Sequence, residues 1–365
     1  MEKVYVVGGA VRDVLLGREP KDLDFVWVGQ TAEAMVELGY EQVGADFPVF
    51  LDADGNEHAL ARKERKVAAG YNGFETDFDP SVTLEDDLVR RDLTVNAMAV
   101  PYDNWDEFTN GNKDSLVDPF GGKNDLGAQV LRHVSEAFAE DPVRVLRVAR
   151  FAARYEFSIA LDTVALMIEL VESGELDALV PERVWAETER ALTEKNPMAF
   201  FRTLKSCRAD QVLFPELRIN GMLETNLNKN ADFCDAQTMF ALMCLDMDFQ
   251  AINDMCDRLT VPNDFRQLAV RSLGFTALLR NGFTALELVD ELNRMRAFQD
   301  KMNFVKVSWV AERSAFNTRM FRARLDDACL AFPAAFNVSF EDLSDEQQET
   351  LKGPAVGEAL RELRA

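Results

Sequence analysis

The sequence predicts an α+β protein in which a mixed-sheet head is followed by an all-helical remainder. In the first hundred residues, short strand-like apolar runs alternate with short helical segments. From Leu84 onward, apolar residues recur with the 3.6-residue period of amphipathic helices. The chain has 365 residues, which is enough for two or three domains with substantial cores.

In the head, a strand is expected at residues 4–7, a helix at 10–16 and a second strand at 23–28. Thr31 has the side chain of an N-cap for a helix that ends near Gly39. Short apolar runs follow at 47–51 and 57–62. The stretch 63–83 contains glycines and a proline, which is typical of a mobile loop.

Beyond the head, helical periodicity is clear at residues 142–155, 161–172, 181–193 and 197–204. The polar run 224–236 and Asn281-Gly282 indicate seams between helical parts, and the polar, acidic run 333–348 predicts a surface loop. We therefore expect a head (1–133), a neck (134–217), a body (218–285) and a tail (286–365).

The composition excludes a protein that binds nucleic acid through overall basicity. The chain carries 63 acidic against 40 basic side chains, a net charge of −23. A local basic stripe is still compatible with this balance, because charges act over only about 8–10 Å at physiological salt.

Five cysteines without a C-x-x-C pair indicate reduced thiols, so a cytoplasmic protein is expected. Met1 leads directly into a strand with no signal-peptide pattern, and no run of 18 apolar residues predicts a membrane helix. His58 and His133 are the only histidines in the sequence, which excludes a metal centre built from a histidine cluster.

Asp22 and Asp24 are the first candidate catalytic residues. They lie at the start of the expected strand 23–28, where positions i and i+2 share a face, so both carboxylates should point the same way. Such a pair suits Mg²⁺, which leaves further positions for substrate phosphates. A pair of solvated acids on an edge strand is the structural alternative, and the short pattern alone favours it.

A glycine-rich turn, Gly8-Gly9, follows the first strand and opens a helix. Backbone N–H groups in such a turn form an anion-binding nest suited to a triphosphate, and Arg12 could reach the same phosphates. The alternative is a tight turn with a solvated Arg12. The turn and the carboxylate pair lie within 17 residues, which favours the functional interpretation.

Two further segments carry clustered polar groups. In the first, Arg90 and Arg91 precede Asp92 and Asn96, which have the i, i+4 spacing of neighbours on one face of a predicted helix. These side chains could bind phosphates and ribose hydroxyls. A helical charge pair is the alternative. In the second, Pro142 suits the first helical position, which makes the preceding aspartate the expected N-cap.

The helix that follows Pro142 carries four arginines within an arc of about 120°, and its opposite face is apolar. A solvated helix face is the alternative to a binding surface. The arginines are Arg144, Arg147, Arg150 and Arg154.

Together these motifs resemble the class II tRNA nucleotidyltransferase family, that is the CCA-adding enzymes, with bacterial poly(A) polymerases as close kin. The matching stretches are GGAVRD, KDLDFVWVG, EDDLVRRDLTVNAMA, DPFGG, LRHVSEAFAEDPVRVLRVARFAARYEF and PERVWAETERAL. The similarity is dense over residues 1–217. The resemblance implies a polymerase beta-like nucleotidyltransferase head.

The resemblance implies that Asp22 and Asp24 bind two catalytic Mg²⁺ ions, and Glu57 is our candidate for a third carboxylate. The triphosphate of ATP or CTP would be held by Gly8, Gly9, Arg12 and Arg91. Family members choose the base with protein side chains, which here would be Asp141 and Arg144. Both cytosine and adenine offer an exocyclic amine beside a ring-nitrogen acceptor, which suits a carboxylate and a guanidinium. Arg147 and Arg150 would extend the nucleotide pocket.

Long bacterial members carry a metal-dependent HD phosphohydrolase domain. Here Leu245 stands where the histidine of its His-Asp pair would be, so this activity is not expected. Between Arg294 and Arg324 there are eight basic residues and two acidic ones, which indicates a phosphate-binding track for tRNA.

The expected function is therefore template-independent addition of C, C and A to the tRNA 3′ end, with contacts to the acceptor and T arm. The alternatives are a poly(A) polymerase or A-adding enzyme, a small-molecule nucleotidyltransferase, and an inactive RNA-binding module. Members of the resembled family that add only C usually have a shortened loop here, so the full-length stretch 63–83 implies an enzyme that is not limited to C. The long helical remainder argues against a small-molecule substrate. Asp22 and Asp24 argue against an inactive module. Oligomeric state stays open.

Overall fold

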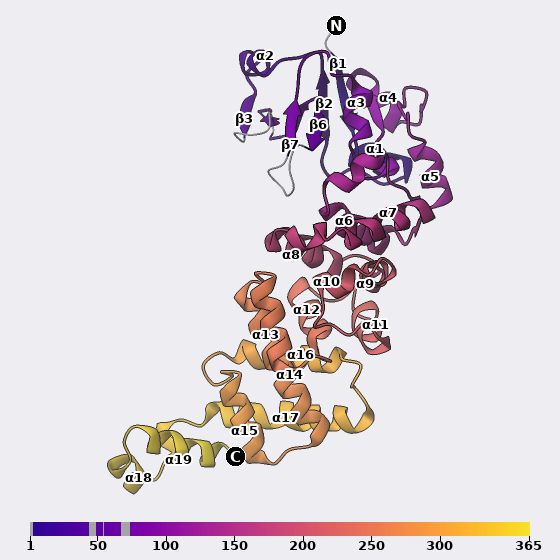
Figure 1. Ribbon diagram of the computed structural model, residues 1–365. Coiled ribbons are helices and arrows are strands. Elements are labelled where there is room, and N and C mark those ends of the chain that lie inside the picture. Colours follow the sequence, from indigo (N-terminus) through magenta and orange to yellow (C-terminus); the bar gives the residue numbers. More distant parts are fainter. Residues whose placement is uncertain (1–2, 44–48, 54, 67–73) are drawn as a thin grey trace. The chain divides into compact units, whose positions relative to one another are not determined.

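The computed structural model describes residues 3–43, 49–53, 55–66 and 74–365 (Figure 1). The chain forms two compact units, one of Met1–Val180 with Thr203–Leu213, the other of Pro181–Arg202 with Phe214–Ala365. The first unit thus joins the expected head to much of the expected neck. The finer division into head, neck, body and tail stays a prediction.

Among the described residues, the first unit contains a six-stranded sheet in the order β3-β4-β5-β2-β1-β8. Most neighbours are antiparallel, but β2 and β5 run parallel, so the sheet is mixed as expected. The strands are β1 (Lys3–Val7), β2 (Asp24–Val28), β3 (Glu41–Val43), β4 (Val49–Leu51), β5 (Glu57–Leu60) and β8 (Ala99–Pro101).

The sheet is held by two clusters of buried apolar side chains. Val7, Val26, Leu88 and Ala99 belong to the larger cluster, which packs α3 (Leu84–Val89) against the sheet. Alternate residues of a strand face the same side of the sheet, so the residues next to Val7 and Val26 face the opposite side. This arrangement places the ends of β1 and β2 next to each other, where the candidate residues lie.

Three details of the first unit differ from the sequence-based expectation. Residues 63–83 are not all loop, because β6 (Lys63–Lys66) and β7 (Phe74–Asp77) pair as an antiparallel hairpin, and residues 67–73 lie outside the described part of the chain. The chain beyond Leu84 is not wholly helical, because β8 adds an edge strand and β9 (Val130–Leu131) pairs with β10 (Ser158–Ile159). These strands form because their backbones hydrogen-bond to partners that are distant in the sequence, and a local periodicity cannot predict such pairing.

The helix expected to end near Gly39 is confirmed, since the Thr31 side chain accepts a hydrogen bond from the backbone N–H of Ala34. The helices of the first unit are α1 (Gly9–Leu15), α2 (Ala32–Glu37), α3 (Leu84–Val89), α4 (Trp105–Thr109), α5 (Gly122–Ala128), α6 (Val143–Tyr155), α7 (Leu161–Glu172) and α10 (Ala209–Leu213). Its 3-10 helices are η1 (Thr94–Asn96), η2 (Tyr102–Asn104), η3 (Glu136–Glu140) and η4 (Glu175–Ala178).

In the second unit, the described residues form helices without a sheet (Figure 1). The run 333–348 is only partly a loop, because α17 continues to Asn337 with Pro333 inside it. Leu245 is buried at the end of α12.

The helices of the second unit are α8 (Pro181–Leu192), α11 (Gly221–Asn228), α12 (Ala236–Cys244), α13 (Phe249–Arg258), α14 (Asn263–Asn281), α15 (Ala285–Arg294), α16 (Lys301–Arg313), α17 (Arg319–Asn337), η5 (Phe340–Asp342), α18 (Asp345–Thr350) and α19 (Pro354–Arg364). The remaining helix, α9 (Pro197–Ser206), has residues in both units. Over the described residues, no helix combines the length and the apolar character that crossing a membrane requires.

Candidate active site

The site begins with two carboxylates on neighbouring strands. Asp24 opens β2 and Glu57 opens β5, and the parallel register places the two residues directly opposite each other. Residues that face each other across two strands share a face of the sheet, so both carboxylates lie at the same edge. Glu57 is held in register by its neighbour His58, whose ring stacks on Phe25 with 4.3 Å between the ring centroids.

Asp22 lies differently from the expectation. The strand β2 begins at Asp24, so Asp22 precedes it and the shared-face argument from strand geometry was wrong for this residue. Asp22 is nonetheless close, because its charge helps to raise the pKa of Asp24. Asp22 is exposed, and Asp24 keeps accessible surface for a substrate although the protein atoms around it reduce its hydration.

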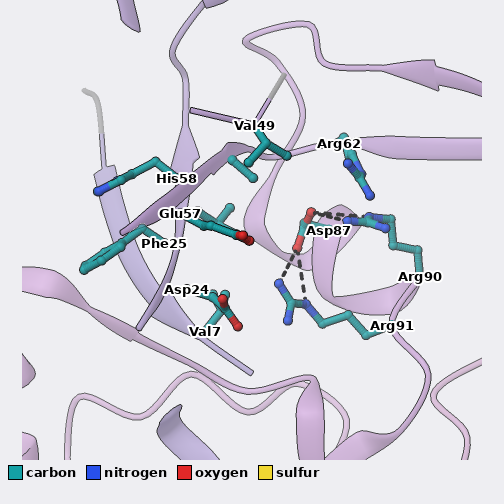
Figure 2. A pocket seen from close by; sticks show the side chains of 12 residues that line it. Val7, Asp24, Phe25, Val49, Glu57, His58, Arg62, Asp87, Arg90 and Arg91 are labelled. Carbon is teal, nitrogen blue, oxygen red and sulfur yellow. Dashed lines mark hydrogen bonds and ion pairs between the residues drawn. The ribbon is translucent and has the colours of Figure 1, made fainter. Parts of the chain in front are cut away.

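A cavity of about 170 Å³ lies over these carboxylates. Asp24 and Glu57 lie on one side of it, and Asp87, Arg90 and Arg91 lie on the other (Figure 2). The remaining lining residues are Val7, Phe25, Val26, Val49, His58, Ala59 and Arg62. Carboxylates that can bind a metal ion therefore face guanidinium groups that can bind an anion across the cavity. A nucleotide with its metal ions requires both kinds of group.

The chemistry of the carboxylates fits a divalent cation. Burial by the surrounding cavity is the main cause that raises the pKa of Asp24, and the charge of Asp22 adds to it, while Arg91 and Arg12 act in the opposite direction. A bound cation would relieve this repulsion between carboxylates. Over the described residues, no three acidic, histidine or cysteine side chains stand together as a complete metal site. Mg²⁺ commonly takes one or two protein carboxylates and fills its other positions with water and substrate phosphates.

The glycine turn lies beside the cavity. Gly8 has φ +70°, a left-handed conformation that favours glycine, and its N–H donates to the Met98 carbonyl. A Cβ atom on Gly8 would lie only 2.8 Å from a terminal nitrogen of Arg91. Glycine at this position therefore lets the Arg91 guanidinium approach the turn.

Arg12 is buried behind the same turn. Its guanidinium donates to the side chains of Asn96 and Asp13 and lies over the rings of Phe151 and Tyr155. The alternative of a solvated Arg12 is wrong. Arg12 connects α1 to η1 and α6, so the Gly8-Gly9 turn is held by groups distant in the sequence.

Asp87 holds the two adjacent arginines at the cavity. One of its carboxylate oxygens accepts from Arg90 and the other from Arg91, with the closest contacts at 3.2 Å in both cases. The two guanidinium groups lower the pKa of this buried carboxyl against the effect of burial. The sequence analysis named Arg90 beside Arg91, but it did not include Asp87 or Arg62 in the site. Asp87 stands at i−3 and i−4 to the two arginines, and that spacing could have indicated the pairs.

Asp92 and Asn96 contact each other, but not on one helix as expected. The chain leaves α3 at Arg90 and enters η1 only at Thr94. The Asn96 amide donates to one oxygen of Asp92 at 3.0 Å, and Nε of Arg147 donates to the other at 2.7 Å. These partners outweigh burial and lower the pKa of Asp92 to about 2.

The approach of α5 to η1 explains the motif DPFGG. Asp118 accepts hydrogen bonds from the N–H groups of Gly122 and Lys123, which caps α5. A Cβ on Gly122 would collide with the Thr94 carbonyl, so only glycine permits this contact. The contact fixes η1, and with it Asn96.

The helix α6 has the apolar face that the sequence predicts, with Val145, Leu146, Ala149 and Ala153 buried. The helix begins at Val143, one residue later than expected, so Pro142 and not Asp141 is at the N-cap position. The Asp141 carboxylate still accepts a hydrogen bond from the N–H of Val143 at 3.2 Å, as a capping side chain does. The arginines do not form a solvated face.

Arg144 and Arg150 are buried. The two terminal nitrogens of Arg144 donate to the carbonyls of Ala137 and Arg90, each at 2.6 Å. Arg150 lies over the ring of Phe151. The hydrogen bond from Arg144 to the Arg90 carbonyl connects α6 to the segment that carries Arg90 and Arg91.

In the second unit, the expected basic track is partly neutralised. Arg322 is paired with Glu312 at 2.7 Å and with Asp326 at 3.2 Å. Arg324 donates to the carbonyls of Leu279 and Arg280 at the end of α14. Both side chains therefore have structural partners.

Comparisons with known proteins agree with this geometry. A family model described as the poly A polymerase head domain matches residues 4–132, and one described as the probable RNA and SrmB-binding site of polymerase A matches residues 156–219. A multifunctional CCA protein of Methylococcus capsulatus is 41% identical, and the alignment covers 99% of this chain and 93% of that protein. A multifunctional CCA protein of Thioalkalivibrio sulfidiphilus is 42% identical, with 99% and 97% covered.

Among solved structures, a CCA-adding enzyme in its apo form II has a TM-score of 0.70 at 24% identity, with 100% of this chain and 88% of that chain covered. The Thermotoga maritima CCA-adding enzyme complexed with tRNA has a TM-score of 0.68 at 24% identity, with 100% and 86% covered. At this identity the likeness concerns the fold.

Proposed function

Because this chain belongs to the family of the multifunctional CCA proteins, we propose that it is a CCA tRNA nucleotidyltransferase. It adds C, C and A to the 3′ end of tRNA from CTP and ATP without a template. The tRNA 3′-hydroxyl attacks the α-phosphate of the nucleotide, and pyrophosphate leaves.

One observation carries this proposal. Asp24 and Glu57 face each other in register, and the cavity above them is closed on its other side by an arginine pair clamped on Asp87. Acidic groups on one side and guanidinium groups on the other suit a nucleotide whose phosphates carry Mg²⁺. The near full-length similarity to CCA proteins, and the similar fold of a CCA-adding enzyme complexed with tRNA, support tRNA as the acceptor.

The site residues of the head have different roles in the proposed reaction. Asp22 and Asp24 would hold Mg²⁺, which, when bound, activates the attacking hydroxyl and stabilises charge on the α-phosphate. Glu57, opposite Asp24, would act as a third carboxylate of the site. The Gly8-Gly9 turn and Arg91 orient the triphosphate. Arg12 positions the turn through its contacts with Asn96 and the rings of α6.

Base choice is assigned to the start of α6. Asp141 can accept from the exocyclic amine of cytosine or adenine, whereas uracil and guanine present a carbonyl that a carboxylate repels. Arg144 and Arg150 would complete this pocket, and Arg147 would join it to the triphosphate side through Asp92 and Asn96. Mismatches of this kind cost about 1–3 kcal/mol for each unpaired buried group.

Leu245, at the place where an HD site would have its histidine, supports an enzyme without phosphohydrolase activity. The second unit is then assigned to tRNA, including its acceptor and T arm. All five cysteines are free thiols, which supports a cytoplasmic location.

The test uses tRNA that ends after the discriminator base, after the first C, or after both C residues. We expect CTP alone to add two residues to the first substrate, and ATP alone to add one residue to the last. Addition of long A tracts to any RNA would instead identify a poly(A) polymerase. Failure to extend any tRNA, with transfer to a small acceptor, would identify a small-molecule nucleotidyltransferase.

A further inference from the structure

The cavity extends beyond the carboxylates in a direction that the proposed nucleotide site does not use. Arg91 lies toward Val7 and Asp24, next to the Gly8 turn, whereas Arg62 lies with Val49 toward the other end (Figure 2). Glu57 and Asp87 lie between the two ends, and Arg90 shares Asp87 with Arg91. The cavity thus has guanidinium groups at both ends and carboxylates in the middle.

The geometry of the reaction assigns the two ends. In phosphoryl and nucleotidyl transfer, the attacking and leaving oxygens lie roughly in line on opposite sides of the phosphorus. If the pyrophosphate leaves toward the Gly8 turn and Arg91, the attacking 3′-hydroxyl must enter from the side of Glu57, Val49 and Arg62. This step rests on the proposed function, which places the triphosphate at the turn.

A 3′-hydroxyl cannot enter alone. The nucleotide that carries it is linked to the rest of the tRNA by a 5′-phosphate, and this anion must accompany the hydroxyl into a region that already contains Asp24 and Glu57. A phosphate approaching these carboxylates is repelled unless a cation lies on its path. A guanidinium is suited to this role because it binds phosphate oxygens in a bidentate way.

We propose that Arg62, assisted by Arg90, binds the backbone phosphate of the last tRNA nucleotide and so delivers the 3′-hydroxyl to the carboxylates. Arg62 lies two residues beyond Leu60, the last residue of β5, so the proposed phosphate ligand follows the strand that begins with Glu57. Arg90 is held from behind by Asp87 through Nε and one terminal nitrogen. Arg62 is half-buried and lines the cavity.

The test compares Arg62→Gln with Lys63→Gln, a matched control. Lys63 is the next residue, is exposed, and pairs with Asp86 rather than lining the cavity. Three quantities are measured: KM for tRNA that lacks its terminal A at saturating ATP, the dependence of that constant on salt, and ATP binding without tRNA. Arg62→Lys serves as a second variant that retains the charge.

We expect Arg62→Gln to raise KM for tRNA about tenfold, the effect of one charge-assisted hydrogen-bonded contact. The salt slope should fall by about 0.7, the value for one phosphate of a single strand, and ATP binding should be unchanged. Arg62→Lys should keep the salt slope. Wild-type enzyme should lose the same factor when the last phosphodiester of the tRNA is a neutral methylphosphonate, and Arg62→Gln should lose nothing further.

A fall in ATP affinity with an unchanged KM for tRNA would place Arg62 on the triphosphate and overturn the proposal. Identical behaviour of Arg62→Gln and the Lys63→Gln control would overturn it too. Neither result would affect the proposed function, which fails only if the wild-type enzyme does not extend truncated tRNA.

Discussion

The carboxylate of Asp92 accepts a 2.7 Å hydrogen bond from the guanidinium of Arg147, although the two residues are 55 positions apart. The second oxygen of Asp92 binds the Asn96 amide, and Asn96 in turn accepts from Arg12. One continuous chain of contacts therefore joins the arginine behind the glycine turn to the helix assigned to base choice. Asp92 and Asn96, expected to bind phosphates or ribose, are occupied by protein partners.

Asp92 should make the stability of the first unit pH-dependent. The pKa of Asp92 is lowered from its usual 3.8 to about 2 in the folded state, so the ion pair stabilises the fold above about pH 4 and this contribution is lost as pH falls toward 2. We expect Asp92→Asn to cost about 2 kcal/mol at pH 7 and clearly less at pH 3. Chemical denaturation at the two pH values measures the difference.

Asp103→Asn is the control for this measurement, because Asp103 is exposed and lies outside the network. An equal cost of Asp92→Asn at pH 7 and pH 3 would contradict the prediction, since it would show that the charge of Asp92 contributes nothing.

Asp24→Asn should abolish nucleotide transfer without weakening the fold. Burial raises the pKa of Asp24, which means that folding makes the charged form of this carboxylate less favourable than it is in the unfolded chain. The neutral amide should therefore leave Tm unchanged or slightly higher. Mg²⁺ should raise the Tm of the wild type more than that of the variant, by preferential binding to the folded state. A variant that still transfers nucleotides would exclude Asp24 as a metal ligand.

Asp141 can be tested for its two roles with two substitutions. Asparagine caps a helix about as well as aspartate, whereas alanine loses about 1 kcal/mol. Asp141→Asn should keep the stability but accept uridine or guanosine more readily, because an amide can donate to their carbonyls. Single-nucleotide incorporation with all four triphosphates, beside a thermal melt, provides the readout. Unchanged selectivity of Asp141→Asn would restrict Asp141 to its capping role.

In the second unit, Arg324 and Arg322 should behave differently. Arg324 supplies donors to two carbonyls at the C-terminal end of α14, so Arg324→Met should cost about 1–2 kcal/mol of stability. Arg322 is exposed between two acidic side chains, and Arg322→Met should have little effect on stability. Melting curves of the two single variants distinguish them. A similar loss for both would show that the carbonyl contacts of Arg324 are not stabilising.

Several parts of the site followed from local sequence patterns. The turn at Gly8, the cap at Asp141 and the apolar face of α6 depend on residues within a few positions of each other, so spacing alone predicts them. The hairpin of β6 and β7 and the edge strand β8 did not follow, because their hydrogen bonds connect residues that no local period relates.

The sequence by itself determined which chemical groups the head carries: paired acids, a glycine turn and clustered arginines. Only the tertiary structure decided which of them meet. The register between β2 and β5 sets Glu57 opposite Asp24, and the hydrogen bonds of α6 to the segment 90–92 bring Arg147 to Asp92. The physical reason is that side-chain types and local spacing can be read from neighbouring positions in the sequence. Long-range pairing depends on the burial and hydrogen bonding of the whole sheet and its helices.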